Sequence, residues 1–209
     1  MDYLEALQKR YSVKKFDKGK KVPPEILENI LEAGRLSASS MGLQPYEIYV
    51  VESDEVKQQL ISSFHNPSQI STCSHLLVMV SKNGLGDEYV DNYFKHISDT
   101  REIPVENLDL FRKNINLQMD ALTNEQIMDW AEKQSYIVLG NLMFAAALEN
   151  VDTCPMEGFN GKSMGEILNI DPEKEKVSVA LALGYRSEED HFQNLKKVRK
   201  PEGKLFKFI

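Results

Sequence analysis

The sequence predicts an α+β protein, in which a small sheet is wrapped by more helix than strand. Segments whose apolar residues recur at helical spacing alternate with a few short apolar runs that are typical of strands. These runs are too few and too dispersed for a regular doubly wound nucleotide-binding fold, and the chain contains no G-x-G-x-x-G motif. The length of 209 residues suits a single domain spanning 1–209.

Composition narrows the class of protein. Hydrophobic residues make up 42% and charged residues 27% of the chain, which favours a folded soluble protein over a disordered one. The net charge of −7 argues against broad nucleic-acid binding, which needs a basic face. Cys73 and Cys154 form neither a disulfide framework nor a metal-ligand pattern, so we expect a reducing cytoplasm. The longest apolar stretch, 137–148, is about half of the ~20 residues that a membrane span needs, and the polar N-terminus does not resemble a signal peptide.

The first part of the chain begins with helices. One is expected over residues 2–10, and a second opens at Pro24, where the missing N–H of proline is harmless, and stops before the small-residue loop 37–42. Acidic residues after Ser53 are typical of a helix start. Strands are expected at 47–51 and 75–81, the second of them covered on both faces.

The middle of the chain is mixed in polarity. Helices at 89–101 and about 108–119 predict a helical excursion from the core at about 84–122 that could act as a lid. Thr123 and Gln126 then form a capping-box pattern that opens a long helix reaching about residue 150. Apolar residues surround the second half of that helix, so we expect it to be deeply buried.

The last part contains two expected strands, a short one at 151–154 and a longer one at 176–184. A turn-rich stretch and a capping box beginning at Ser163 separate them. In the longer strand Val177 is expected on the same face as Val179, Leu181 and Leu183, with alanines opposite. The tail at about 195–209 is basic and then apolar, so it must pack on its own domain or on a partner chain.

Several catalytic patterns are absent or defective. The chain has no H-E-x-x-H or C-x-x-C motif, and its four histidines show no ligand spacing. The segment 158–163 resembles a phosphate loop, but its glycine spacing is wrong, so we interpret it as a turn before a capped helix. The sequence predicts no metal site.

Two basic clusters lie near the two ends of the chain. The first contains Arg10, Lys14 and Lys15, and the second contains four cations at 196–200. Together they could hold an anionic group such as a phosphate monoester, although the residues alone favour solvated surface patches. The loop 37–42 could likewise offer hydroxyls and N–H groups to a ligand, or be an ordinary connection between elements.

Five segments in the same order resemble motifs of the FMN-dependent nitroreductases. They are Arg10-Tyr11-Ser12-Val13-Lys14-Lys15-Phe16 (R-x-S-x-K-x-F), Ser37-Ala38-Ser39-Ser40 with Gln44-Pro45 (the "SPSS…QP" loop), Gly140-Asn141 in an apolar helix, Pro155-Met156-Glu157-Gly158-Phe159 (P-x-E-G-F), and Lys197-Val198-Arg199 (K-x-R). The resemblance spans residues 10 to 199 and is closest to the oxygen-insensitive NAD(P)H nitroreductase and dihydropteridine reductase branch. It implies a sandwich-like fold with a mostly antiparallel sheet, in an intertwined homodimer with FMN at the interface.

The resemblance also assigns site residues. It implies that Arg10, Ser12, Lys197 and Arg199 hold the FMN phosphate, and that Lys14 lies near the pyrimidine end of the flavin and tunes it. Asn66 would bind the pyrimidine edge, and the N–H groups of Glu157 and Gly158 would face the N5/O4 edge. Ser37, Ala38, Ser39 and Ser40 would come from the other subunit, and the tail would embrace that subunit. The remaining expected cofactor-binding residues are Tyr11, Gln69, Pro155 and Met156.

The implied function is an FMN-dependent NAD(P)H oxidoreductase with ping-pong kinetics, acting on nitroaromatics, quinones or similar flat electron-poor acceptors. NADH and NADPH remain alternatives, because Gln69 replaces a lysine of the best-known branch. Met41-Gly42 replaces Thr-Asn and makes the expected substrate wall more apolar. Two other hypotheses stay open: specialised flavin chemistry such as dehalogenation or dehydrogenation, and a non-catalytic flavin-binding or dimeric scaffold.

Overall fold

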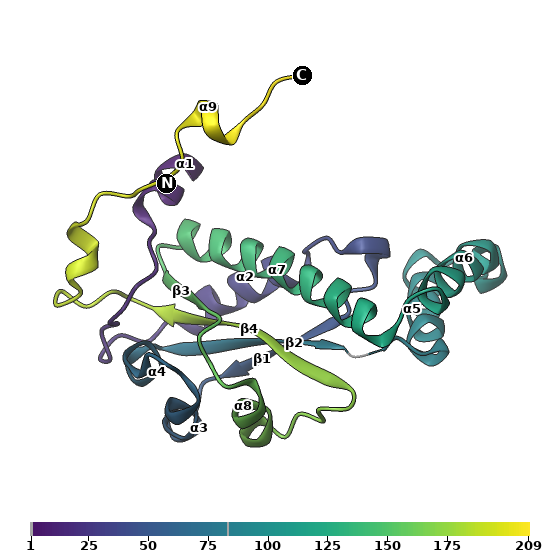
Figure 1. The fold of residues 1–209 in the computed structure, drawn as a ribbon, viewed down its shortest axis with the longest axis horizontal. Helices are drawn as coiled ribbons and strands as arrows, with labels where there is room; N and C mark the ends of the chain where they lie inside the picture. The colour runs from purple at the N-terminus through teal and green to yellow at the C-terminus, as the bar shows by residue number, and fades with distance from the viewer. Residues whose placement is uncertain (1, 83) are drawn as a thin grey trace.

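A four-stranded sheet lies at the centre of the computed structural model, which describes residues 2–82 and 84–209 (Figure 1). Its strand order is β1-β2-β4-β3, and every neighbouring pair is antiparallel. The fold is therefore α+β, as the sequence predicts. The strands are β1 (Tyr46–Val51), β2 (His75–Lys82), β3 (Asp152–Met156) and β4 (Glu175–Gly184).

Helices cover both faces of this sheet (Figure 1). The α-helices are α1 (Tyr3–Lys9), α2 (Pro24–Arg35), α3 (Asp54–Leu60), α4 (Pro67–Thr72), α5 (Asp87–Arg101), α6 (Asp109–Asp120), α7 (Asn124–Leu148), α8 (Gly161–Leu168) and α9 (Glu202–Leu205). Short 3-10 turns are η1 (Ser40–Gly42), η2 (Ile61–Ser63), η3 (Val105–Leu108) and η4 (His191–Asn194). None of the helices in the described part of the chain is long and apolar enough to cross a membrane.

The two faces of the sheet carry separate apolar cores. On one face α2 and α7 pack over Leu77 and Leu181, and on the other α3, α4 and α8 pack over Val78 and Ala180. Alternate residues of β2 and β4 therefore point into different cores, which is why both strands are apolar throughout. The expectation that β2 is covered on both faces is confirmed.

A β-bulge changes the alternation within β4. Met79 pairs with Val179, but the next residue of β2, Val80, pairs with Val177, so Ser178 is the extra residue. Val177 consequently joins the core under α8, and its predicted position beside Val179 and Leu181 was wrong. Hydroxyl groups occupy the bulge: Ser81 Oγ lies 2.7 Å from Ser178 Oγ and 2.8 Å from the Oγ of Ser135 on α7.

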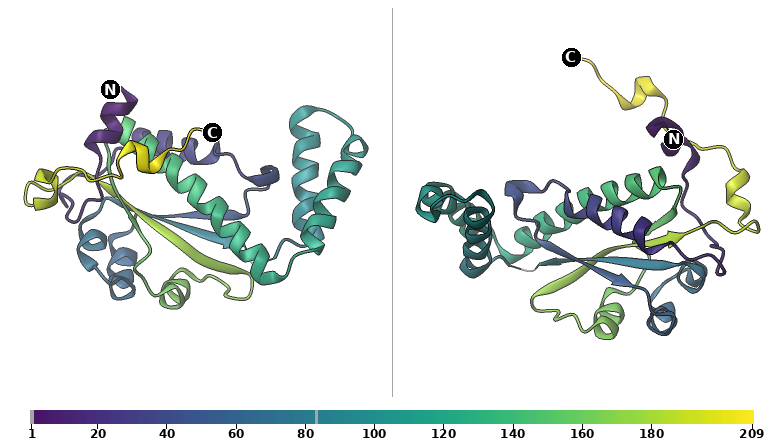
Figure 2. Two further views of the ribbon diagram at one scale, coloured as in Figure 1. Left: turned by 45° about the horizontal axis from the view of Figure 1, so that its top comes forward. Right: turned by 180° about the vertical axis from the view of Figure 1, so that it is seen from behind.

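Helices α5 and α6 form a hairpin that projects beyond the sheet (Figure 2). It has a small core of its own, which includes Phe94 and Ile115. The Tyr93 hydroxyl donates to the Met41 carbonyl at 3.0 Å, and the Tyr89 hydroxyl donates to that of Leu43 at 2.8 Å. The hairpin is therefore tied to the loop between α2 and β1.

Several element boundaries refine the sequence predictions. The capping box of Thr123 and Gln126 is present at the start of α7. The capping box expected at Ser163 is absent, because α8 begins at Gly161 and its N-cap is Asn160. The Asn160 side chain accepts a hydrogen bond from the Ser163 N–H at 3.1 Å. Strand β3 continues through Met156, so the predicted turn begins later than expected.

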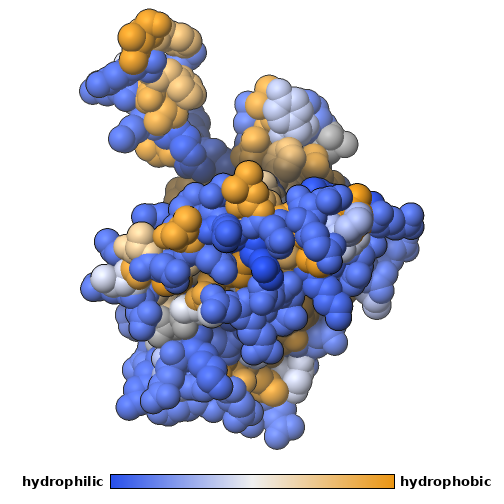
Figure 3. All heavy atoms as spheres, turned by 90° about the vertical axis from the view of Figure 1, so that its right-hand side faces the viewer, coloured by the Kyte–Doolittle hydropathy of each residue, from blue (hydrophilic) through white to orange (hydrophobic). Residues whose placement is uncertain are grey.

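Helix α7 and the C-terminal tail leave apolar side chains exposed. The predicted deep burial of the second half of α7 holds for one side only, since Tyr136, Ile137, Phe144 and Leu148 each keep 36–44% of their surface. In Figure 3 the protruding lobe at the top left is the tail, and its tip is strongly hydrophobic. Its exposed apolar residues are Leu205, Phe206, Phe208 and Ile209.

Candidate functional site

The segment between α1 and α2 runs along the edge of the sheet. The Val13 N–H donates to the Thr153 carbonyl of β3 at 3.2 Å, and that of Asp17 donates to the Tyr185 carbonyl at 2.7 Å. Val13 and Phe16 are buried beneath the segment. This arrangement fixes the first basic cluster beside β3.

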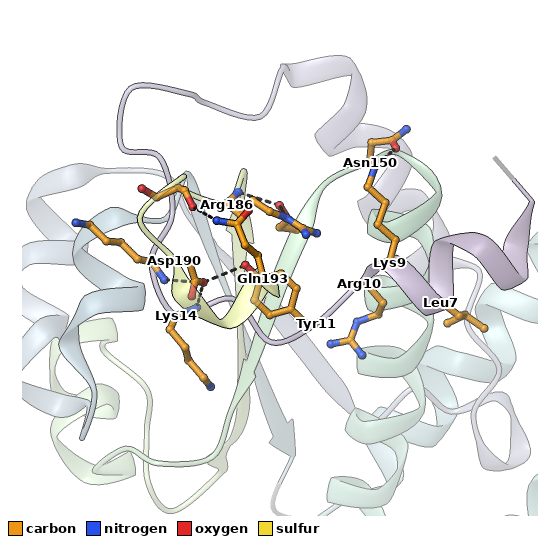
Figure 4. A network of polar contacts seen from close by, with 12 residues as sticks. Leu7, Lys9, Arg10, Tyr11, Lys14, Asn150, Arg186, Asp190 and Gln193 are labelled. Carbon is orange, nitrogen blue, oxygen red and sulfur yellow. Dashed lines mark hydrogen bonds and ion pairs between the residues drawn. The ribbon is translucent and has the colours of Figure 1, made fainter. Parts of the chain in front are cut away.

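Asp190 organises this segment from the other end of the chain. Its Oδ2 accepts the N–H of Lys14 at 2.7 Å, the N–H of Lys15 at 3.3 Å and the Tyr11 hydroxyl at 3.1 Å (Figure 4). Burial alone would raise the pKa of Asp190, but these hydrogen bonds, together with one from the Phe192 N–H, hold it below the ordinary value. A buried carboxylate thus sets the backbone from which Lys14 extends.

Arg186 is a structural cation. Its guanidinium forms a bidentate ion pair with Asp152, with Nε 2.9 Å from Oδ2, and lies 4.6 Å above the ring of Tyr11. The hydrogen bonds that Arg186 donates to Asp152 raise the pKa of Arg186. Because this charge is already compensated, Arg186 supports the site wall and leaves little charge for a ligand.

Three other cations have no such compensation. Within residues 2–82 and 84–209, Arg10, Lys197 and Arg199 form no ion pair with a carboxylate. Lys197 Nζ donates to the Leu7 carbonyl at 2.7 Å and to that of Arg10, which brings the second basic cluster to the first. Burial and the neighbouring charge of Arg199 lower the pKa of Arg10, and burial with both arginines lowers the pKa of Lys197.

These cations surround a cavity of about 530 Å³, which we call the cation cavity. The Nε atom of Arg10 is buried without a hydrogen-bond partner. An anion in the cavity would relieve the mutual repulsion and satisfy this donor. The lining residues are Gln8, Lys9, Arg10, Tyr11, Ser12, Lys14, Arg186, Phe192, Gln193, Leu195, Lys196, Lys197 and Arg199.

A second cavity, of about 230 Å³, lies at the end of β3 and is called here the turn cavity. Gln69 is only 3% exposed, and its Oε1 atom has no hydrogen-bond partner. Among the hydrogen bonds of the described chain, none uses the N–H of Glu157 or of Gly158. The lining residues are Lys14, Phe64, His65, Asn66, Gln69, Cys154, Pro155, Met156, Glu157 and Gly158.

The turn that borders this cavity is held on two sides. The His65 N–H donates to the Gly158 carbonyl at 2.9 Å, and the ring of Phe64 packs edge-on against that of Phe159 at 5.8 Å. From α7, the Tyr136 hydroxyl donates to Glu157 Oε1 at 2.6 Å. The cavity therefore combines one unpaired acceptor with two unpaired donors on a fixed backbone.

The structure brings together most of the residues singled out from the sequence. Lys14 lines both cavities, so the two are adjacent, and twelve of the expected cofactor-binding residues line one or the other. Those twelve are Arg10, Tyr11, Ser12, Lys14, Asn66, Gln69, Pro155, Met156, Glu157, Gly158, Lys197 and Arg199.

The expected residues of the loop after α2 lie elsewhere. Neither cavity of the described chain includes Ser37, Ala38, Ser39 or Ser40 in its lining. Two amides of α7 hold this loop instead: Asn141 Nδ2 donates to Ser37 Oγ at 2.7 Å, and Gln134 Oε1 accepts from the Ser40 N–H at 2.8 Å.

Other residues of the site were not identified from the sequence. Asp190, Arg186 and Asp152 carry no motif, and only their contacts show that they build the cation cavity. His65 directly precedes Asn66 in the chain but belongs to no pattern of its own. Cys154 is buried, and burial raises its pKa.

The segment Gly161-Lys162-Ser163-Met164-Gly165 also fits the G-x-S-x-G pattern of hydrolases. That chemistry needs a serine next to a histidine base. Ser163 instead lies in the first turn of α8, where its Oγ is 2.8 Å from Ser63 Oγ. The pattern is therefore incidental here, like the imperfect phosphate loop that overlaps it.

The chain resembles a group of known proteins over its whole length. Residues 7–185 match the sequence profile described as the nitroreductase family. A Staphylococcus haemolyticus protein provisionally named an NAD(P)H nitroreductase is 36% identical over 214 aligned residues, covering 99% of this chain and 96% of the relative.

Solved structures agree with this match. A Staphylococcus epidermidis protein provisionally named an NAD(P)H:FMN oxidoreductase has a TM-score of 0.87 and 25% identity, covering 100% of this chain and 96% of that one. An Exiguobacterium sibiricum protein provisionally named a nitroreductase, solved in complex with FMN, has a TM-score of 0.86 and 22% identity, covering 100% of this chain and 98% of that one.

Proposed function

This chain belongs to the nitroreductase family, and from that premise we propose that it is an FMN-dependent NAD(P)H oxidoreductase. One observation carries the proposal: a cavity lined by uncompensated cations adjoins a cavity with unpaired hydrogen-bonding groups. A flavin mononucleotide has a dianionic phosphate at one end and a planar ring with polar edges at the other. One bound molecule would therefore occupy both kinds of cavity, side by side.

The cation cavity fits the phosphate. Arg10 supplies a planar donor group whose Nε is buried and unpaired, and Lys197 and Arg199 supply further positive charge. Ser12 lines the same cavity and offers a hydroxyl. Asp190 fixes the backbone of this segment, and its own carboxylate is engaged by N–H and O–H donors of the chain.

The turn cavity fits the polar edge of the ring. The unpaired Oε1 of Gln69 would accept a ring N–H, and the N–H groups of Glu157 and Gly158 would donate to ring nitrogen or oxygen. When bound, FMN would take a hydride from NADH or NADPH and pass it, in a separate step, to a flat electron-poor acceptor such as a nitroaromatic or a quinone. Lys14 would favour the reduced state electrostatically, because its cation lies where both cavities meet.

We also propose that the working form is a homodimer with FMN at the interface. The exposed apolar side of α7 and the apolar tail both need a surface on which to pack. Gly140 lies on that side of α7, and no atom outside α7 in residues 2–82 and 84–209 would lie within 4 Å of a Cβ placed there, which leaves room for a partner helix. A second chain would also bring its loop 37–40 to the flavin, which a single chain does not do.

The test is the visible spectrum of the purified protein before and after anaerobic NADH or NADPH. Flavin bands near ~375 and ~450 nm that bleach with either reductant are expected. Bands that ignore both reductants would replace the proposal with specialised flavin chemistry, and protein that takes up no FMN would leave only a scaffold role. Sedimentation that shows a monomer with bound FMN would contradict the dimer.

A further inference from the structure

The proposed function gives no role to the imidazole of His65. This ring lines the turn cavity and is exposed to water. His65 is exposed, and within the described residues neither of its ring nitrogens forms a hydrogen bond or an ion pair. Its backbone N–H holds the Gly158 carbonyl at 2.9 Å, so its position relative to the turn is fixed.

The ring itself packs on the turn. A Cβ placed on Gly158 would come within 3.3 Å of His65 Nδ1 and 3.7 Å of its Cγ, so the Nδ1 side of the ring lies directly against this glycine. Nε2 lies farther from that position than Nδ1 and Cγ do, and within the described residues it has no hydrogen-bond partner. Glycine at 158 therefore leaves room for the imidazole beside the turn, where a side chain would press against it.

Reduction of the acceptor needs a proton as well as a hydride. When a quinone takes a hydride, it gains two electrons and one proton, and its other oxygen is left as an anion. A second proton must reach that oxygen to give the hydroquinone. Side chains that exchange protons near neutral pH are the most effective donors, and imidazole is the one that does so without perturbation.

The other titratable groups that line the cavity, or that contact its turn from outside, are less suited to this task. Cys154 is 1% exposed, and burial raises its pKa. Tyr136, from α7, already donates its proton to Glu157, and burial together with that hydrogen bond raises its pKa to about 12. Lys14 is shared with the cation cavity, and Glu157 is already engaged by the Tyr136 hydroxyl.

We propose that His65 is a catalytic residue that binds the oxygen of the acceptor and protonates it as the hydride arrives. In this step the Nε2–H bond of the imidazolium breaks, an O–H bond forms on the acceptor, and the neutral imidazole regains a proton from water. The hydride derives from NADH or NADPH by way of the flavin. This inference rests on the proposed function, since it requires the acceptor to stand over the turn cavity.

The experiment compares His65→Gln with the wild-type protein and with His96→Gln, a matched exposed histidine on α5 that lines neither cavity. Anaerobic stopped-flow absorbance separates bleaching by NADH from reoxidation by 1,4-benzoquinone. In His65→Gln we expect bleaching to change less than about 2-fold, while reoxidation at pH 7 slows by about 100-fold and its pH dependence between 5 and 8 flattens. His96→Gln should match the wild type in both steps.

A second readout does not depend on turnover. Binding of 4-nitrophenol to the oxidised protein, without reductant, should weaken about 10-fold in His65→Gln at pH 6.5 and be unchanged in His96→Gln. Equal reoxidation rates and equal 4-nitrophenol affinity in His65→Gln and wild type would overturn the inference. So would equal slowing of both half-reactions with loss of FMN affinity, which would make His65 a wall of the flavin site only. Failure of the proposed function looks different, because the wild-type flavin would then not bleach at all.

Discussion

The cation cavity and the turn cavity share Lys14 but are built in opposite ways. The cation cavity is lined by long charged side chains from the two ends of the chain, and its cations repel one another. The turn cavity is bordered by the turn at 155–158 and by the buried amide of Gln69, and that turn is held by the core helix α7 and by the segment before α4. Binding strength and binding orientation are thus assigned to different parts of the molecule.

The comparison predicts how substitutions in each cavity change the binding of a ligand. Charge in the first cavity acts over several ångströms and is screened by salt, whereas hydrogen bonds in the second act only at contact. Substitutions in the first should weaken ligands that carry a phosphate, and those in the second should weaken every ligand that carries the ring. Four changes test this division, beginning with one that should damage both cavities.

The largest effect is expected for Asp190→Ala. Removing the carboxylate leaves the N–H groups of Lys14 and Lys15 and the Tyr11 hydroxyl without their acceptor in a site that is 2% exposed. We expect the free energy of unfolding to fall by about 2–4 kcal/mol. Urea unfolding measures this loss. Asp190→Asn keeps one acceptor oxygen and should lose less, and equal losses in the two variants would show that the charge itself matters.

The pKa of Asp190 also predicts the direction in which the stability of the protein changes with pH. Its folded pKa lies below the ordinary value, so its contribution to stability is present above the unfolded pKa of ~3.9 and is lost as the pH falls through the folded pKa. In the wild-type protein stability should therefore drop at acidic pH more steeply than in Asp190→Ala.

The next effect concerns the cation cavity alone. Arg10→Gln should weaken FMN binding by about 10–100-fold, since a charged hydrogen-bonding group is lost opposite the phosphate. Riboflavin, which lacks the phosphate, should bind equally well to variant and wild type. Fluorescence titration with both ligands provides the measurement and its control. A similar loss for riboflavin would break the division between the two cavities.

Gln69→Leu tests the turn cavity, because it should weaken flavin binding without lowering the stability of the FMN-free protein. Oε1 of Gln69 is buried and unpaired, so its removal should leave the stability of the FMN-free protein unchanged or raise it by up to about 1 kcal/mol. The same change should weaken both FMN and riboflavin by about 5-fold, because both carry the ring. Thermal unfolding of the FMN-free protein and the two titrations report these effects separately. A stability loss would mean that Gln69 already has a partner without flavin.

The smallest effect should come from a simple anion. Burial and the neighbouring arginines lower the pKa of Lys197, and an anion in the cavity would offset the repulsion between these cations. Inorganic phosphate should raise the melting temperature by about 1–3 °C over sodium chloride of the same ionic strength. Arg10→Gln should lose this difference, and its persistence there would place the anion elsewhere.

The sequence predicted the elements of the fold well where the pattern was local. The cap at Thr123 and the apolar strand at 75–81 each depend on neighbours in the chain, and both are confirmed. The position of Val177 could not be predicted, because the bulge at Ser178 is set by pairing with β2 and by hydroxyls from α7.

The candidate site likewise contains residues that could be predicted from the sequence and residues that could not. Motif residues such as Arg10 and Lys197 could be identified in the sequence as members of basic clusters, and the fold brings them together. Asp190 and Arg186 were not visible, since a carboxylate that accepts distant backbone N–H groups has no sequence signature. His65 carried no spacing that would mark it, and only its contact with Gly158 distinguishes it from other exposed histidines.

The meeting of Arg10 and Lys197 separates the folding of the sheet from the assembly of the cation cavity. All four strands precede residue 185, whereas Lys197 and Arg199 follow it. The sheet could therefore form without these two cations, but the cavity would then lack one wall. Capture of a phosphate-bearing cofactor would thus depend on docking of the C-terminal segment as well as on folding of the core.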